Sequence, residues 1–232
     1  MKPENIHAGH RKREKDYYLQ HGFANVPLHK ILEVLLFFSV PQRDTNAAAH
    51  ALANKFGTLK NVIDADFDEL LSVDGISENS AMFFKLFAHA AKEYFLCESN
   101  GGMPLACSDE MLAFCRALFL GAKEEEVYAL FLDNELRLIK PVKIGGGFAL
   151  SADFSAGLVV KAAFAHSASR VVLAHNHPNG FSMPSQQDVI ATSALFTTLK
   201  PLQIRLEDHV IVGTDGEWSM RAMENLKEIW GN

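Results

Sequence analysis

Residues 171–178 read VVLAHNHP, and a short loop later residues 184–188 read PSQQD. The apolar run predicts a buried strand, on which His175 and His177 point to the same face because alternate side chains do so. The proline after the second histidine prevents the strand from continuing inside a sheet. The two imidazoles are therefore predicted to lie side by side at a strand end that faces a loop.

Ser185 and Asp188 stand at the first turn of a predicted helix over residues 185–199. The same spacing is typical of an ordinary N-terminal capping arrangement, and both interpretations can hold together. If Asp188 folds back toward His175 and His177, two nitrogens and one oxygen leave a fourth tetrahedral position for water. That layout is typical of a catalytic zinc site, although the same donors also suit other divalent ions. The sequence thus predicts one Zn²⁺ per chain.

A carboxylate is expected near the metal to take a proton from that water. Glu126 opens a predicted strand over residues 126–132 and is the preferred candidate, while spacing alone does not exclude Glu124 and Glu125. Metal-bound histidines generally need an outer hydrogen-bond partner. Asp208 is a candidate for that support, or it simply lies on a strand beside the site.

The chain changes character near residue 100. Before that point the pattern is almost entirely helical, and after it strands alternate with helices, which predicts helices covering a mixed sheet. In this second half the pattern predicts a strand over residues 136–144 and a last helix over residues 221–229. Breaker residues in CESNGGMPLAC indicate a linker. We expect a polar N-terminal segment, a helical domain, a linker and a metal-binding domain over residues 1–25, 26–96, 97–107 and 108–232.

Composition points to an ordinary globular protein, with 48% hydrophobic and 22% charged residues among 232. The net charge of −6 argues against a general polyanion binder, and the basic run at residues 11–13 is interpreted as a solvated helix or tail. Three cysteines without CxxC spacing argue against a disulfide framework and against a cysteine zinc cluster. A polar N-terminus and short apolar stretches predict no secretory signal and no membrane span, and therefore a cytoplasmic location.

The pattern His175-x-His177, seven residues, then Ser185-x-x-Asp188 resembles the JAMM motif of MPN-domain metalloproteases. The longer stretches LAHNHPNG, PSQQD and LEDHVIVG are similar to the bacterial RadC family. The helical half is RadC-like as well, in LEVLLFF and in KFGTLKNVIDADFDELLSVDGI. The resemblance implies an all-α domain followed by an α/β (α+β) mixed-sheet domain of the MPN/JAMM type, which is cytidine-deaminase-like. It also implies that Glu126 is the general base and that Ser185 supports the water or the developing oxyanion.

The chain departs from the family pattern in two places. Where RadC-like chains commonly carry Pro-Arg-Glu, residues 154–157 read FSAG. In the first half, residues 70–77 resemble a helix-hairpin-helix, whose turn can offer backbone N–H groups from Gly75 onward to a nucleic-acid phosphate. Here Ser77 replaces the second glycine and Asp74 precedes the turn. A hairpin that only packs helices is the alternative.

The leading functional hypothesis is a zinc-dependent hydrolase that acts on an amide or isopeptide bond of a peptide partner. The alternative is a DNA-associated protein of repair or recombination, in which the helical half binds nucleic acid and the metal site is regulatory or vestigial. A scaffold module is a third hypothesis, which the complete set of metal ligands disfavours.

Overall fold

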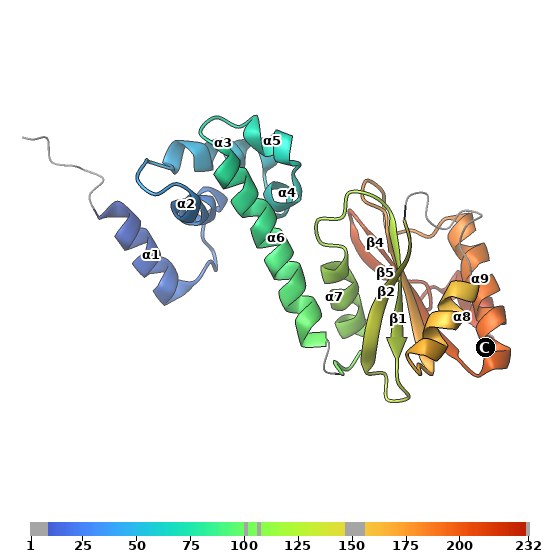
Figure 1. The fold of residues 1–232 in the computed structure, drawn as a ribbon. Coiled ribbons are helices and arrows are strands. Elements are labelled where there is room, and N and C mark those ends of the chain that lie inside the picture. The colour runs from blue at the N-terminus through green and yellow to red at the C-terminus, as the bar shows by residue number, and fades with distance from the viewer. Residues whose placement is uncertain (1–8, 100–101, 106–107, 147–155, 231–232) are drawn as a thin grey trace, which may run out of the picture. The chain divides into compact units, whose positions relative to one another are not determined.

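The computed structural model describes residues 9–99, 102–105, 108–146 and 156–230. The chain divides into two compact units, Met1–Ala90 and Ala91–Asn232, and the boundary falls inside one long helix (Figure 1). Residues 154 and 155, where the sequence departs from the RadC pattern, lie outside the described part. Within the described part, no helix is long and apolar enough to cross a membrane.

The first unit is helical, as expected. Its helices are α1 (His10–His21), α2 (Leu28–Ser39), α3 (Asn46–Phe56), α4 (Leu59–Asp64), α5 (Phe67–Leu71) and the first part of α6 (Glu78–Ser99). Buried apolar side chains of α2, α3 and α6 meet in one core, which includes Leu32, Leu36, Leu52 and Phe84. Removal of this apolar surface from water is the main force that holds the short helices together.

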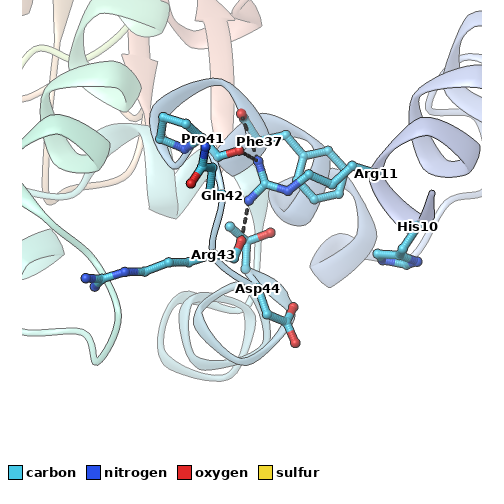
Figure 2. A pocket seen from close by; sticks show the side chains of 8 residues that line it. His10, Arg11, Phe37, Pro41, Gln42, Arg43 and Asp44 are labelled. Carbon is cyan, nitrogen blue, oxygen red and sulfur yellow. Dashed lines mark hydrogen bonds between the residues drawn. The ribbon is translucent and has the colours of Figure 1, made fainter. Parts of the chain in front are cut away.

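Arg11 fastens α1 to the carboxyl end of α2. Its guanidinium donates to the carbonyl oxygen of Pro41 at 2.9 Å, to that of Phe37 at 3.5 Å and to that of Arg43 (Figure 2). The guanidinium also lies 4.9 Å from the centre of the Phe37 ring. The basic run over residues 11–13 is therefore helical, but Arg11 is a cation that satisfies the free carbonyl groups at a helix end and is not simply solvated.

Glu33 on α2 is a buried carboxylate at the α1 contact. His10 Nε2 lies 2.9 Å and Lys30 Nζ 3.1 Å from its oxygens. Burial alone would raise the pKa of Glu33, but the hydrogen bonds from these two partners outweigh it and hold the pKa below its usual value. The polar character of α1 thus reflects a helix that docks through charges.

The turn between α5 and α6 is the hairpin expected from the sequence. Gly75 adopts a left-handed backbone conformation with φ of 85°, and a Cβ atom placed there would lie 3.0 Å from the Cβ of Ala48 on α3. Ser77 accepts a hydrogen bond from the backbone N–H of Ser80 at 3.3 Å. Both residues therefore have a structural reason within the helical unit: one permits close packing and the other caps α6.

The second unit is a five-stranded mixed sheet between two layers of helices. Its strands are β1 (Glu126–Leu132), β2 (Leu138–Gly146), β3 (Arg170–Asn176), β4 (Arg205–Gly213) and β5 (Gly216–Ser219), in the order β2-β1-β3-β4-β5. Only β3 and β4 are parallel; the other neighbours are antiparallel. The helices are α7 (Ser108–Leu118), α8 (Ala156–Ala165), α9 (Gln186–Leu199), η1 (Lys200–Leu202) and η2 (Glu224–Trp230).

Each face of the sheet has its own core. Helix α7 covers one face, where Phe114 and Leu118 pack on Leu130 and Val172. Helices α8 and α9 cover the other face (Figure 1), with a core formed by Val127, Ala129, Phe131, Val159, Val171, Leu173, Leu195 and Ile211. Because both faces are covered, the residues of β1 and β3 are nearly all buried.

Two element boundaries differ from the sequence-based expectation. The second strand begins at Leu138 instead of residue 136, because the Asp133 side chain accepts hydrogen bonds from the backbone of Glu135 and Arg137 and extends the turn. The helix expected over residues 221–229 is a shorter 3₁₀ helix that starts at Glu224. Hydrogen bonds from Arg221 N to Asp208 and from Ala222 N to Ser219 hold the preceding residues in a turn.

Part of the segment expected to be a linker belongs to the second unit. Leu105 is fully buried in the core beneath α7, and its backbone N–H donates to Leu136 O at 2.9 Å. Pro104 forms a bridge to Arg137. The stretch around residues 102–105 therefore covers one end of the outer edge of β2.

We expect Gly75→Ala to lower the free energy of unfolding of the helical unit. The left-handed conformation alone disfavours a side chain by about 1–2 kcal/mol, and the contact with Ala48 adds to that value. Gly57→Ala is the matched control, because Gly57 also has a positive φ (73°) but a Cβ atom placed there would have nothing within 4 Å. Urea unfolding of both variants should show the larger loss at Gly75; equal losses would mean that the Ala48 contact contributes nothing.

Candidate metal centre

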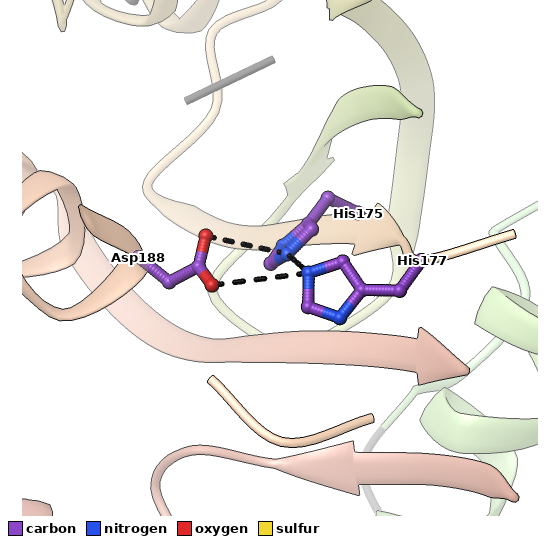
Figure 3. A group of neighbouring side chains, drawn as sticks. All are labelled: His175, His177 and Asp188. Atoms are coloured by element: carbon purple, nitrogen blue, oxygen red, sulfur yellow. Dashed lines mark hydrogen bonds and ion pairs between the residues drawn. The ribbon is translucent and has the colours of Figure 1, made fainter. Parts of the chain in front are cut away.

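His175, His177 and Asp188 come together at the end of β3 and the start of α9. The Nε2 atoms of the two histidines lie 2.9 Å apart. Asp188 places one carboxylate oxygen 3.3 Å from His175 Nε2 and the other 3.9 Å from His177 Nε2 (Figure 3). His175 and Asp188 are buried and His177 is partly exposed. Within the described residues, no other group of three histidine, cysteine or acidic side chains is close enough to hold a metal ion.

The imidazole of His177 is oriented by a backbone carbonyl. Its Nδ1 lies 2.7 Å from Phe181 O, and its backbone N–H donates to Val212 O at 2.8 Å. Because a carbonyl oxygen can only accept, Nδ1 carries the proton of the neutral ring. The lone pair of His177 Nε2 therefore points toward His175 and Asp188.

The loop that provides this carbonyl is tied to the turn between β4 and β5. Ser182 donates from its backbone N–H and its hydroxyl to Asp215, at 2.8 and 2.9 Å. Thr214 N donates to Gly180 O at 2.8 Å. The loop passes so close to Gly213 that a Cβ atom there would lie 2.3 Å from Ser182 N. These contacts hold the Phe181 carbonyl, and through it His177, in a fixed place.

His175 is oriented by a chain of buried hydrogen bonds that runs through His209. Thr192 Oγ1 lies 2.5 Å from the backbone oxygen of Asp188 and 2.6 Å from His209 Nδ1. The single hydroxyl proton goes to the carbonyl, so the hydroxyl accepts from His209 Nδ1–H. In the neutral ring His209 Nε2 is then an acceptor, and it receives the Nδ1–H of His175 at 2.8 Å. The lone pair of His175 Nε2 is left facing His177.

Burial keeps both of these imidazoles neutral. It lowers the pKa of His175 to about 4; the carboxylate of Asp188 acts in the opposite direction and His177 in the same direction. Burial also lowers the pKa of the fully buried His209 well below its usual value. A neutral imidazole is the form that binds a metal.

The donor set fits a divalent metal ion. His175 and His177 present two lone pairs to each other at 2.9 Å, and both Nδ1 protons are already donated elsewhere. Without a cation between them, this arrangement is repulsive. Ligand atoms about 2.0–2.1 Å from a tetrahedral ion lie roughly 3.3 Å apart. The 2.9 Å between the two Nε2 atoms and the 3.3 Å between His175 Nε2 and one Asp188 oxygen are close to that value. Two nitrogens and one oxygen leave one tetrahedral position open.

Ser185 caps α9 and also orients Asp188. The Ser185 hydroxyl accepts from Asp188 N at 3.2 Å, and the Asp188 carboxylate accepts from Ser185 N at 2.7 Å. The two interpretations of this spacing therefore hold together in the structure: the reciprocal capping pair turns the carboxylate back toward the histidines. The hydroxyl proton of Ser185 is not used by this pair.

Asp208 lies on the wrong face of β4 to support the metal ligands. Its carboxylate accepts from Ser219 Oγ and from the backbone N–H groups of Arg221 and His209. Side chains alternate along a strand, so the neighbouring His209 faces the site and Asp208 does not. His209 was missed because the sequence offered both residues side by side, without a signal for which of them faced the site.

Glu126 likewise points away from the three ligands. Its carboxylate lies 2.6 Å from Lys143 Nζ and forms a side-chain hydrogen bond with Tyr128, which packs beneath α7. Val127, one residue later, is paired with His175 and belongs to the α9 face.

Glu125 lines the same cleft as His177. It directly precedes β1, and the alternation of that strand, continued two residues back from Val127, places it on the face of Val127 and His175. Glu125 and His177 both line a cleft of about 660 Å³, together with Lys123, Glu124, Pro178, Asn179 and Gly180. Sequence reasoning left Glu125 open as a neighbour of Glu126, and counting back in steps of two from a strand residue known to face the site would have selected it.

A mixed sheet between helical layers, with an HxH pair at a strand end and an aspartate on the next helix, is typical of a domain of the MPN/JAB class, and its His-His-Asp group could hold a metal ion. A family model described as RadC-like JAB domain matches residues 105–226, and the chain belongs to the RadC family. It is also similar to the UPF0758 protein SPO0054 of Ruegeria pomeroyi, with 29% identity over 213 residues that cover 92% of this chain and 95% of the relative. The expected family and fold class are confirmed.

We expect His209→Ala to weaken metal binding about 10- to 100-fold, the usual effect of removing the partner that orients a ligand. Asp208→Asn is the matched control and should leave the affinity unchanged, because Asp208 lies on the other face of the strand. Competition with a chromophoric chelator measures both. A lower metal affinity in Asp208→Asn, with an unchanged affinity in His209→Ala, would identify Asp208 as the supporting residue instead.

Proposed function

We propose that the chain is a zinc-dependent hydrolase that cleaves an amide or isopeptide bond in a peptide substrate in the cytoplasm. The observation that carries the proposal is the set of two imidazole lone pairs and one carboxylate, with a fourth position open beside a cleft. Structural zinc sites are closed by four protein ligands, whereas catalytic sites keep one position free.

His175, His177 and Asp188 would hold the zinc ion, one per chain. A zinc ion there supplies Lewis-acid chemistry: it polarises a carbonyl group and lowers the pKa of water at its open position to about 7. The three ligands are held by partners of their own, so they need little rearrangement on binding the ion.

Glu125 is proposed as the general base. It takes a proton from the attacking water and passes it to the leaving nitrogen, while the new carbon–oxygen bond forms and the carbon–nitrogen bond breaks. Its support is that it lines the cleft with His177, and that it stands two residues before Val127, which pairs with His175. Glu126, the residue preferred from the sequence, is paired with Lys143 on the opposite face.

Ser185 is proposed to stabilise the oxygen of the attacked carbonyl. Its hydroxyl oxygen accepts from Asp188 N, so its proton is available for donation to an oxygen that gains negative charge. The side chain is exposed at the first turn of α9 and is therefore accessible to a substrate.

Nucleic acid is not part of this proposal. Gly75 and Ser77 are accounted for by packing and capping within the helical unit, and Asp74 would repel a phosphate at the same turn. If the full chain bound duplex or branched DNA, and this binding became weaker as the salt concentration rose, the nucleic-acid hypothesis would be supported again.

We expect the purified protein to contain about one zinc per chain, because its donor set is complete. His177→Ala should lose the ion, since only one nitrogen and one carboxylate remain. Elemental analysis of both proteins measures this. A parent protein that takes up no divalent metal even when zinc is supplied would contradict the proposal.

Glu125→Gln should keep the zinc and lower hydrolysis about 10²- to 10⁴-fold, because the amide cannot take a proton. Glu126→Gln is the matched control and should retain hydrolysis. Turnover is measured by mass spectrometry on a mixture of peptides and isopeptide-linked peptides. Loss of activity in the Glu126 variant alone would return the base to that residue.

A further inference from the structure

Asn176 is a buried polar residue that the proposed chemistry does not use. It stands between His175 and His177, so its side chain points to the opposite face of β3, and it is 3% exposed. A buried amide needs hydrogen-bond partners. Both partners are backbone groups of the neighbouring chain segment that carries Glu125.

The side chain of Asn176 forms hydrogen bonds with the peptide groups on both sides of Glu125. Its Oδ1 accepts from Glu126 N at 2.7 Å, and its Nδ2 donates to Glu124 O at 3.1 Å. The backbone pairing of β1 with β3 begins at Val127, opposite His175. The asparagine side chain therefore continues the ladder beyond its last backbone pair and holds Glu125 as though it were still in the strand.

We propose that Asn176 is a positioning residue that holds Glu125 beside the metal ligands; this rests on the proposed function. Asparagine matches both bonds because its amide carries an acceptor, Oδ1, and a donor group, Nδ2, at the correct reach. Aspartate has no donor for Glu124 O, and serine is too short to span both groups. The segment around Glu125 precedes β1, and the Asn176 bonds hold it on the β3 side.

The arrangement also explains the tripeptide His175-Asn176-His177. The two histidines point to the metal face and the residue between them points away, toward β1. One strand end thus sets both the metal ligands and the place of the proposed base. Three consecutive residues therefore carry the two histidines and hold the segment that contains the proposed base.

We expect Asn176→Ala to keep the zinc, to lower kcat about 10- to 100-fold and to leave KM nearly unchanged. Its effect should vanish in the Glu125→Gln background, because Asn176 acts through Glu125. The exchange of the Glu126 amide hydrogen should become about tenfold faster. Asn134→Ala, an exposed asparagine in the turn at the far end of β1, is the matched control.

Asn176→Ser is the second variant, since its single hydroxyl can meet at most one of the two backbone groups and buries no charge. It should show a smaller effect of the same kind, and it keeps the test informative if the alanine variant does not fold. Loss of zinc in both variants, additive losses with Glu125→Gln, or an unchanged exchange rate at Glu126 would each overturn the proposal. If the zinc-loaded parent hydrolyses no peptide, the proposed function fails, and the exchange rate still decides whether Asn176 holds this segment.

Discussion

The site depends on one electrostatic constraint: two neutral imidazoles whose lone pairs face each other across 2.9 Å. Such a pair is unfavourable unless a cation lies between the nitrogens, and the surrounding structure prevents the rings from turning away. His177 is held by a carbonyl and His175 by the chain through His209 and Thr192. The free energy that holds this arrangement comes from the folded domain, so the three side chains are already placed as a metal ion would require.

The end of β3 and the start of α9 both have backbone groups that lack a partner within the strand or the helix. Regular backbone hydrogen bonding ends near the three proposed ligands, and polar side chains form hydrogen bonds with the backbone groups that remain. Ser185 and Asp188 each accept a hydrogen bond from the other's backbone N–H at the start of α9. In the loop between β3 and α9, Ser182 N donates to the Asp215 carboxylate. A group of hydrogen bonds that stabilises helix and loop therefore also determines the direction of the third ligand.

Much of this could be predicted from the sequence, because helix caps, glycine breaks and apolar runs fall where the elements begin and end. The spacing of His175, His177 and Asp188 likewise points to one site, and the structure brings the three together. The sequence is less informative about which side chains of a strand face which side of the sheet. Strand β1 is buried on both faces, so it has no alternation of polar and apolar residues to show which side Glu125 or Glu126 faces. The same ambiguity hid His209 beside its neighbour on β4.

The one-residue phase of a strand therefore decides the chemistry of this site more than the identity of the residues. Two adjacent glutamates have the same charge and nearly the same reach, yet Glu126 forms an ion pair with Lys143, while Glu125 lines the cleft with His177 and is the proposed base. A register slip of one residue in β1 would exchange their roles without changing the composition of the site. The Asn176 side chain opposes such a slip, because it bonds the two peptide groups that flank Glu125. A buried polar side chain at the end of a sheet can thus determine which of two equivalent acids faces a metal.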